Sequence, residues 1–87
     1  VPKDSLIFTQ QEFEINKFKE LILTDKEIID LRLKVISVAE SQLNNGTLST
    51  TDYITNLNAL DQAEQNQALH ILQLLQAQIN QQTTKGK

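Results

Sequence analysis

Few side chains in this sequence could do chemistry. His70 is the only histidine, cysteine is absent, and the nearest serine along the chain is Ser49. A histidine that acts as a general base in nucleophilic catalysis needs a serine or cysteine within hydrogen-bond reach, and a metal site needs further ligands around it. The sequence places neither beside His70. We therefore interpret His70 as a partly buried polar residue between helices, and we expect no metal site.

Asp61 and Glu64 are the other candidates for chemistry. Their spacing of three places both carboxylates on one face of a helix, where they could form a general acid–base pair. Two helices alone offer no concave pocket for a substrate, and carboxylates on a helix surface are usually solvated. We therefore expect a protein that is not an enzyme and that uses no cofactor.

Length and charge restrict the remaining classes of function. The chain has 87 residues and a net charge of −3, and its densest basic cluster is only Lys17 to Lys19. This is not the basic surface that nucleic acid requires. No apolar run approaches the ~20 residues of a membrane-spanning helix, and no signal peptide is visible. Because Val1 is not a natural start, we expect a processed or excised fragment.

The element that carries the first half of the chain is a long helix with a seven-residue repeat. A coiled coil has such a repeat, labelled a to g, with apolar residues at a and d. Asp25 and Arg32 interrupt the d row; they either fix the register and pair with a neighbouring helix or face solvent. The a row is Ile15, Ile22, Ile29, Ile36 and Leu43, and the d row is Phe18, Asp25, Arg32 and Ala39.

Further apolar rows run beside this seam. One holds Leu21, Ile28 and Val35, and another holds Leu31 and Val38. A two-stranded coiled coil needs one seam only. The helix is therefore expected to contact more than one neighbour. The isolated chain is expected to form dimers or larger oligomers, either by side-by-side packing or by exchange of arms through the turn.

A second helix is predicted by apolar residues at helical spacing after residue 50. Between Tyr53 and Gln82 it has no lysine or arginine and only two acids, Asp61 and Glu64, with glutamine and asparagine filling the other polar positions. This composition either suits close neighbours or a narrow water-filled space, or is a simple compositional bias. The apolar positions are Leu57, Leu60, Ala63, Ala68, Ile71, Leu72, Leu74, Leu75 and Ile79.

The turn chemistry is concentrated in "NNGTLSTTDY", residues 44–53. Gly46 can adopt the left-handed conformation that ends a helix, and Ser49 is a favourable N-cap. Asp52, three residues later, completes a capping box, while Leu48 and Tyr53 have the spacing of a hydrophobic staple. A short connection of this kind makes the two helices antiparallel neighbours.

The predicted fold is all-α: one long antiparallel two-helix hairpin, a coiled coil with a short glycine-containing turn. Helix 1 is expected at about residues 10–45, the turn at 46–49 and helix 2 at about 50–82. Residues 1–2 and 7–9 could be extended, and the tail from residue 83 to residue 87 is expected to fray. At ~1.5 Å per residue, a continuous first helix would be about 60 Å long.

The stretch "NNGTLSTTDYITNLNALDQAEQNQA" resembles the second periplasmic helical hairpin of the TolC family of outer-membrane efflux proteins. The segments "TDKEIIDLR", "QLNNGTLSTTDY" and "LHILQLLQAQINQQTTKG" are similar to the Bacteroidetes-type branch, and the resemblance covers roughly residues 10–86. In that family three protomers form a β-barrel in the outer membrane and an α-helical tunnel across the periplasm. The resemblance thus implies a periplasmic part of an outer-membrane channel of a Gram-negative bacterium, homotrimeric at full length, with a fragment that does not itself span the membrane.

The resemblance also implies that the turn is the functional end of the hairpin. Hairpin turns of the family dock on a periplasmic adaptor (membrane fusion) protein, and acidic residues near the turns narrow the tunnel. The adaptor-contacting tip would be Gly46, Thr47, Leu48 and Ser49, and the candidate gate would be Asp52. Leu48 and Thr55 depart from the best-known pattern, in which an arginine tether and a second acid can stand at these places. An arginine tether and a doubled acidic ring are therefore in doubt.

Two questions stay open at the level of sequence. Asp52 either lines a gate or only completes the capping box at the positive end of the helix dipole. Leu48 is either an adaptor contact or only the staple partner of Tyr53. The alternative to the channel is a stand-alone coiled-coil module that binds partner helices.

Overall fold

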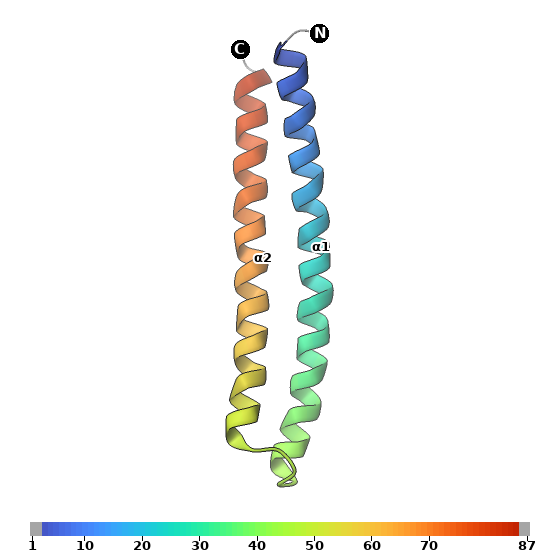
Figure 1. Cartoon of the computed structure of the whole chain (residues 1–87), viewed down its shortest axis with the longest axis vertical. Helices are drawn as coiled ribbons and strands as arrows, with labels where there is room; N and C mark the ends of the chain where they lie inside the picture. Colours follow the sequence, from blue (N-terminus) through green and yellow to red (C-terminus); the bar gives the residue numbers. More distant parts are fainter. Residues whose placement is uncertain (1–2, 86–87) are drawn as a thin grey trace.

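Two long antiparallel helices make up the fold. The computed structural model describes residues 3–85, which form α1 (Lys3–Asn44) and α2 (Thr50–Lys85) joined by a turn at residues 45–49 (Figure 1). No strand occurs within residues 3–85. The molecule is a rod 65 Å long and 14 Å wide in each other direction. The predicted all-α hairpin is therefore correct.

Both helices run further from the turn than the sequence indicated. α1 begins at Lys3 rather than near residue 10, so the expectation of extended backbone at residues 7–9 is wrong. The reason is that Phe8 and Gln11 continue the a and d rows by one more repeat, and both are half-buried against α2. α2 continues to Lys85, so residues 83–85 do not fray from the helix. The remaining end residues, 1–2 and 86–87, lie outside the described part of the chain.

The seam of α1 follows the predicted heptad rows. Ile15 and Ala39 are buried, and so is Asp25, while the other a-row residues are half-buried. Arg32 is the one member of the d row that is exposed. The predicted interruption of the apolar row by two charged residues thus has two outcomes: Asp25 points into the seam, and Arg32 reaches solvent.

The seam of α2 is more polar than its apolar spacing suggested. Ala63 and Ala77 are buried, but half of the seam positions carry asparagine, glutamine, histidine or threonine. Most of the large apolar residues of α2 are exposed instead, among them Ile71, Leu72 and Leu75. The seam repeats at seven-residue spacing through Tyr53, Asn56, Leu60, Ala63, Gln67, His70, Leu74, Ala77, Gln81 and Thr84.

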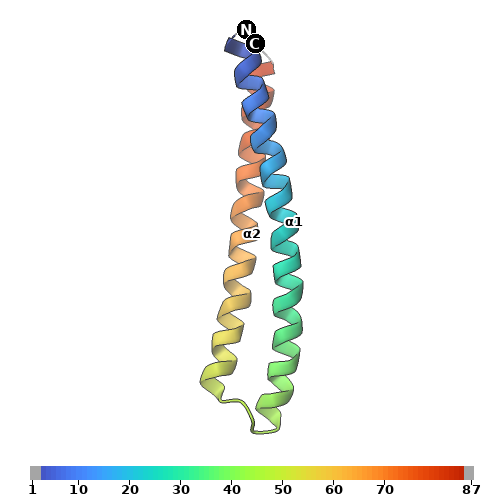
Figure 2. The same cartoon turned by 45° about the vertical axis from the view of Figure 1, so that its right-hand side comes forward.

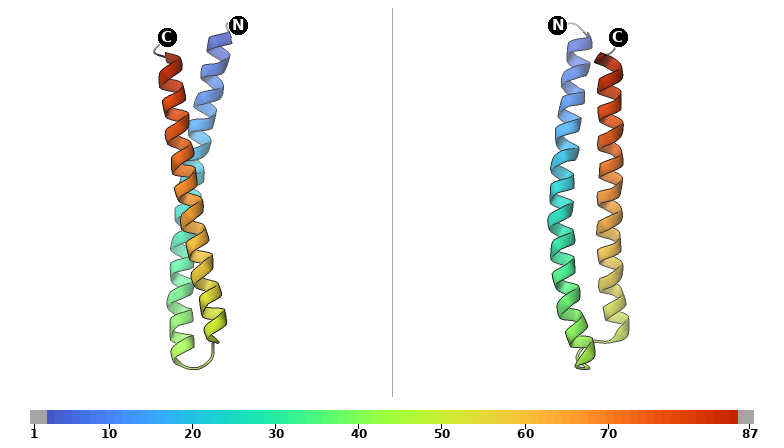
Figure 3. Two further views of the ribbon diagram at one scale, coloured as in Figure 1. Left: turned by 90° about the vertical axis from the view of Figure 1, so that its left-hand side faces the viewer. Right: turned by 180° about the vertical axis from the view of Figure 1, so that it is seen from behind.

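The two helices wind slightly around each other. After a turn of 45° the upper halves overlap while the lower halves separate (Figure 2). In the left view of Figure 3, α2 passes in front of α1 at a shallow angle, and the right view shows the two helices running side by side along their length. This is the arrangement expected when two seams of seven-residue period stay in contact over many turns.

Candidate functional site

The turn begins with a fully formed helix C-cap. Gly46 has φ of 75°, a left-handed conformation that glycine adopts without steric cost. The N–H of Thr47 donates to the carbonyl of Gln42 at 2.8 Å, and the N–H of Gly46 donates to the carbonyl of Leu43 at 3.1 Å. These two bonds are the pair that defines a Schellman motif. The Thr47 hydroxyl adds a third bond to the Gln42 carbonyl at 3.1 Å, so the chain leaves α1 in one defined direction.

Ser49 opens the second helix. Its carbonyl accepts the first helical bond from the N–H of Tyr53 at 3.0 Å, and its Oγ accepts from the N–H of Asp52 at 3.1 Å. This is the geometry of an N-cap residue. The return bond of a capping box, from the Ser49 N–H to the Asp52 carboxylate, is absent from the hydrogen bonds of the described residues. Asp52 therefore acts on α2 through its charge near the positive helix end.

Together the predicted tip residues form the lower end of the rod. Gly46, Thr47 and Ser49 are exposed, whereas Leu48 and Tyr53 are both half-buried. Partial burial of Leu48 and Tyr53 is what a hydrophobic staple requires. The surface offered at the tip is consequently small and mostly polar, with the Leu48 side chain only partly accessible. Asp52 is exposed on the first turn of α2.

Asp25 and His70 form a polar pair across the seam. Nδ1 of His70 lies 2.5 Å from Oδ2 of Asp25, and the side chains are 23% and 10% exposed. The two atoms are within hydrogen-bond distance, and Nδ1 is the donor when the carboxylate is ionised, because an ionised carboxylate can only accept. His70 is thus the partly buried polar residue between helices that the sequence indicated, and Asp25 takes the pairing role that was left open for it.

A second polar contact repeats this arrangement nearer the chain ends. Nε2 of Gln11 donates to Oγ1 of Thr84 at 3.0 Å. Fourteen residues separate Gln11 from Asp25, and fourteen separate His70 from Thr84, so the two contacts are two heptads apart on both helices. The register is therefore the same at both places.

Charged groups outside the seam do not gather into a chemical centre. Among residues 3–85 no group of three histidine, aspartate or glutamate side chains could hold a metal ion. Asp61 accepts a hydrogen bond from Gln65 of its own helix at 3.3 Å, and both Asp61 and Glu64 are exposed. A surface hollow of about 450 Å³ is bordered by residues of α1 alone, including Phe13 and Lys17, so it does not lie between the helices. This hollow does not include Asp61 or Glu64.

Large apolar side chains instead cover parts of the outer faces. On α1 one group of them occupies positions g and c of the heptad, and on α2 one group occupies positions e, b and f; outside these groups lie Phe13, Leu23, Leu33 and Leu69. In an antiparallel pair the g positions of both helices border one face and the e positions the other, so the two groups lie on opposite faces of the rod. We name them the α1 stripe, which is Leu21, Ile28, Leu31, Val35 and Val38, and the α2 stripe, which is Ala68, Ile71, Leu72, Leu75 and Ile79.

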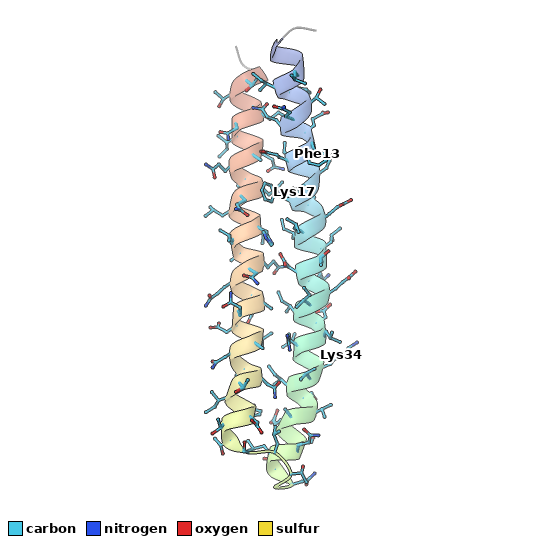
Figure 4. The ribbon with its side chains drawn as sticks, in the orientation of Figure 1. Phe13, Lys17 and Lys34 are labelled. Atoms are coloured by element: carbon cyan, nitrogen blue, oxygen red, sulfur yellow. The ribbon has the colours of Figure 1, made fainter. Side chains whose placement is uncertain are left out.

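The two stripes are accessible along much of their length. Leu31 and Val38 of the α1 stripe, and Leu72 and Ile79 of the α2 stripe, are each more than half exposed. Figure 4 shows side chains projecting outward all along both helices, with Phe13 and Lys34 on the side of α1 that faces away from α2. Predicted contact with more than one neighbour would cover these stripes.

None of the described helices is long and apolar enough to cross a membrane. In comparisons with known proteins, no family model, no curated protein and no solved structure matches this chain.

Proposed function

We propose that this chain is a wall-and-tip segment of a TolC-like export channel: a periplasmic hairpin that packs against neighbouring helices and presents its turn to a periplasmic adaptor protein. The observation that carries the proposal is the pair of exposed apolar stripes on opposite faces of the 65 Å rod. A soluble monomer rarely exposes long apolar surface without a partner. A helical wall supplies a neighbour on each side of a hairpin.

The turn supports the second half of the proposal. A docking tip must keep one shape, and the backbone of residues 45–49 is tied to both helices through the C-cap at Gly46 and the N-cap at Ser49. The resemblance of "QLNNGTLSTTDY" to the family's adaptor-contacting turn supplies the identity of the partner. In this function the chain is a passive structural part without catalysis or cofactor, and the energy for export comes from another component.

A stand-alone coiled-coil module is the second candidate, and one observation favours it. The hairpin closes a seam of its own, with the Asp25–His70 pair in the middle and the Gln11–Thr84 contact near the chain ends. A scaffold that binds single partner helices would need such a self-contained hairpin. Its stripes would then be covered by different proteins rather than by repeats of one assembly.

The test is to isolate the complete gene product from the membranes of the bacterium that encodes it. The channel proposal expects a second related hairpin and intervening β-strands in the same gene, a trimer on mass photometry, and ion conductance in planar bilayers. A product that is water-soluble, lacks β-strands and conducts no ions would instead favour the scaffold.

A further inference from the structure

We propose that the α1 stripe is a self-association surface, on which a second copy of the free chain packs with its α1 antiparallel. The inference goes beyond the proposed function, because a wall of hairpins that all point the same way would bring a different helix to this stripe. It concerns the chain on its own and is tested separately.

The shape of the stripe suits another helix. Leu21, Ile28 and Val35 recur at seven-residue spacing, and Leu31 and Val38 recur in the same way on the adjacent row. Alternating steps of three and four residues are the pattern of a coiled-coil seam. Near the turn, Val35, Val38 and Ala39 border an apolar surface hollow of about 290 Å³, which a side chain of a packed helix could enter.

The positions of these residues are symmetric under an antiparallel two-fold axis. The midpoint of the stripe falls between residues 29 and 30, so Leu21 of one copy lies opposite Val38 of the other. Ile28 lies opposite Leu31 by the same operation. A two-fold contact must be self-complementary in this sense, since one surface patch meets itself.

Charges beside the stripe select the same arrangement. Glu27 and Lys34 both occupy position f, on one edge of the stripe and on either side of its midpoint. The antiparallel two-fold axis brings Glu27 of each copy beside Lys34 of the other, which gives two opposite-charge contacts.

A parallel pairing would use these charges less fully. It would bring Glu27 near Arg32 of the second copy but would leave Lys34 beside Ala39, whereas the antiparallel pairing gives both Glu27 and Lys34 a partner of opposite charge. The α2 stripe has no comparable pattern, because no lysine or arginine lies between Tyr53 and Gln82. The charges therefore favour one pairing of the α1 stripe and favour none for the α2 stripe.

The first experiment is sedimentation equilibrium of the 87-residue chain and two matched variants. Leu31 in the stripe is 61% exposed, and Leu23 on another side of α1 is 63% exposed, so their replacement by glutamine alters similar amounts of apolar surface. We expect the parent and Leu23→Gln to dimerise alike, and Leu31→Gln to remain monomeric at the same concentration. Loss of the dimer in Leu23→Gln alone, equal effects of both changes, or a monomeric parent would overturn the inference.

Orientation is tested by disulfide trapping, which is clean because the natural chain has no cysteine. Leu21→Cys and Val38→Cys chains are mixed and oxidised; we expect the mixed disulfide in excess over either homodimer. A predominance of homodisulfides, which join position 21 to position 21 and position 38 to position 38, would show a parallel pairing and contradict the inference. Glu27→Lys should weaken dimerisation on the order of tenfold, and Glu27→Lys with Lys34→Glu should restore it. Failure of the double exchange to restore the dimer would also contradict it.

Discussion

Oδ2 of Asp25 in α1 and Nδ1 of His70 in α2 lie 2.5 Å apart in the seam of the hairpin. The side chains belong to residues 45 positions apart in sequence, and the contact fixes which residues of the two helices face each other. A buried polar pair contributes little net stability, but removal of one partner leaves the other without its hydrogen bond. The pair therefore contributes more to the register of the two helices than to the stability of their packing.

Replacement of Asp25 by alanine should lower the free energy of unfolding by about 1–3 kcal/mol, because His70 then loses its acceptor in a partly dry seam. Asp30→Ala is the matched control, since Asp30 is an exposed acid of the same helix and should change stability by less than about 0.5 kcal/mol. Urea denaturation followed by circular dichroism, at one fixed low protein concentration, measures both values. Equal losses in the two variants would show that Asp25 makes no special contribution.

The double variant Asp25→Leu with His70→Leu should recover most or all of that loss, because two apolar residues leave no buried polar group unpaired. Its cost should instead appear in register. Paired spin labels on exposed positions of α1 and α2 should give one narrow distance distribution in the parent and a broader one in the double variant. A distance distribution that stays narrow in the double variant would show that other contacts of the seam set the register.

Gly46→Ala should destabilise the hairpin by about 1 kcal/mol. The φ of 75° is unfavourable for alanine, while the space around the glycine is open, with nothing within 4 Å of an added Cβ. The cost is then conformational rather than steric, so Gly46→Asn should be milder because asparagine tolerates the left-handed region. Thermal unfolding of the three proteins tests the order glycine, asparagine, alanine. If asparagine proved no better than alanine, conformation would not be the source of the cost.

Ser49 and Asp52 should differ in their effect on α2. Ser49→Ala removes the acceptor for the Asp52 N–H and should cost about 1 kcal/mol. Asp52→Asn removes only a charge at the helix start and should cost at most a few tenths of a kcal/mol at moderate salt. The free energies of unfolding at low and high salt separate the two effects, because only the charge term is screened. A larger loss for Asp52→Asn than for Ser49→Ala would contradict the observed cap.

Asp52 has a further expected role if the chain lines a channel. Acids from three protomers that converge on a narrow lumen attract cations. In the complete channel, Asp52→Asn should therefore reduce the preference for cations and weaken block by polyvalent cations added on the periplasmic side. The change should be modest, because Thr55 provides no second acidic ring. Planar-bilayer recordings with unchanged selectivity and block would leave Asp52 as a charge at the helix end only.

The parts of the fold that could be predicted are those with a strong local cause. The seven-residue recurrence of isoleucine at positions 15 to 36 gave the α1 seam, and the glycine and serine of the turn gave its two caps. These patterns depend on residues close together in sequence. The hairpin follows from these local patterns because a short turn places the second helix beside the first, antiparallel to it.

The α2 seam could not be predicted in the same way. Apolar spacing pointed to residues such as Leu72 and Ile79, yet the seam carries Asn56, Gln67 and His70. A search for apolar periodicity fails when a helix has more apolar surface outside its seam than in it. The missed evidence was the regular placement of polar and small residues at alternating steps of three and four, with Ala63 and Ala77 among them. The hydrogen bond between Gln11 and Thr84 lies near the chain ends, and no local sequence pattern predicts it.

The most direct test of the central claim is site-specific photo-crosslinking in the bacterium that encodes the chain. A photoreactive residue is placed at Thr47 on the tip, at Leu72 in the α2 stripe, or at Glu64, an exposed control position midway along α2. We expect Thr47 to crosslink to a periplasmic adaptor protein and Leu72 to crosslink to another helix of the same channel. Glu64 should give no adaptor adduct. Adaptor adducts at Glu64 and none at Thr47, or a Leu72 that captures only unrelated proteins, would contradict the channel and its docking tip.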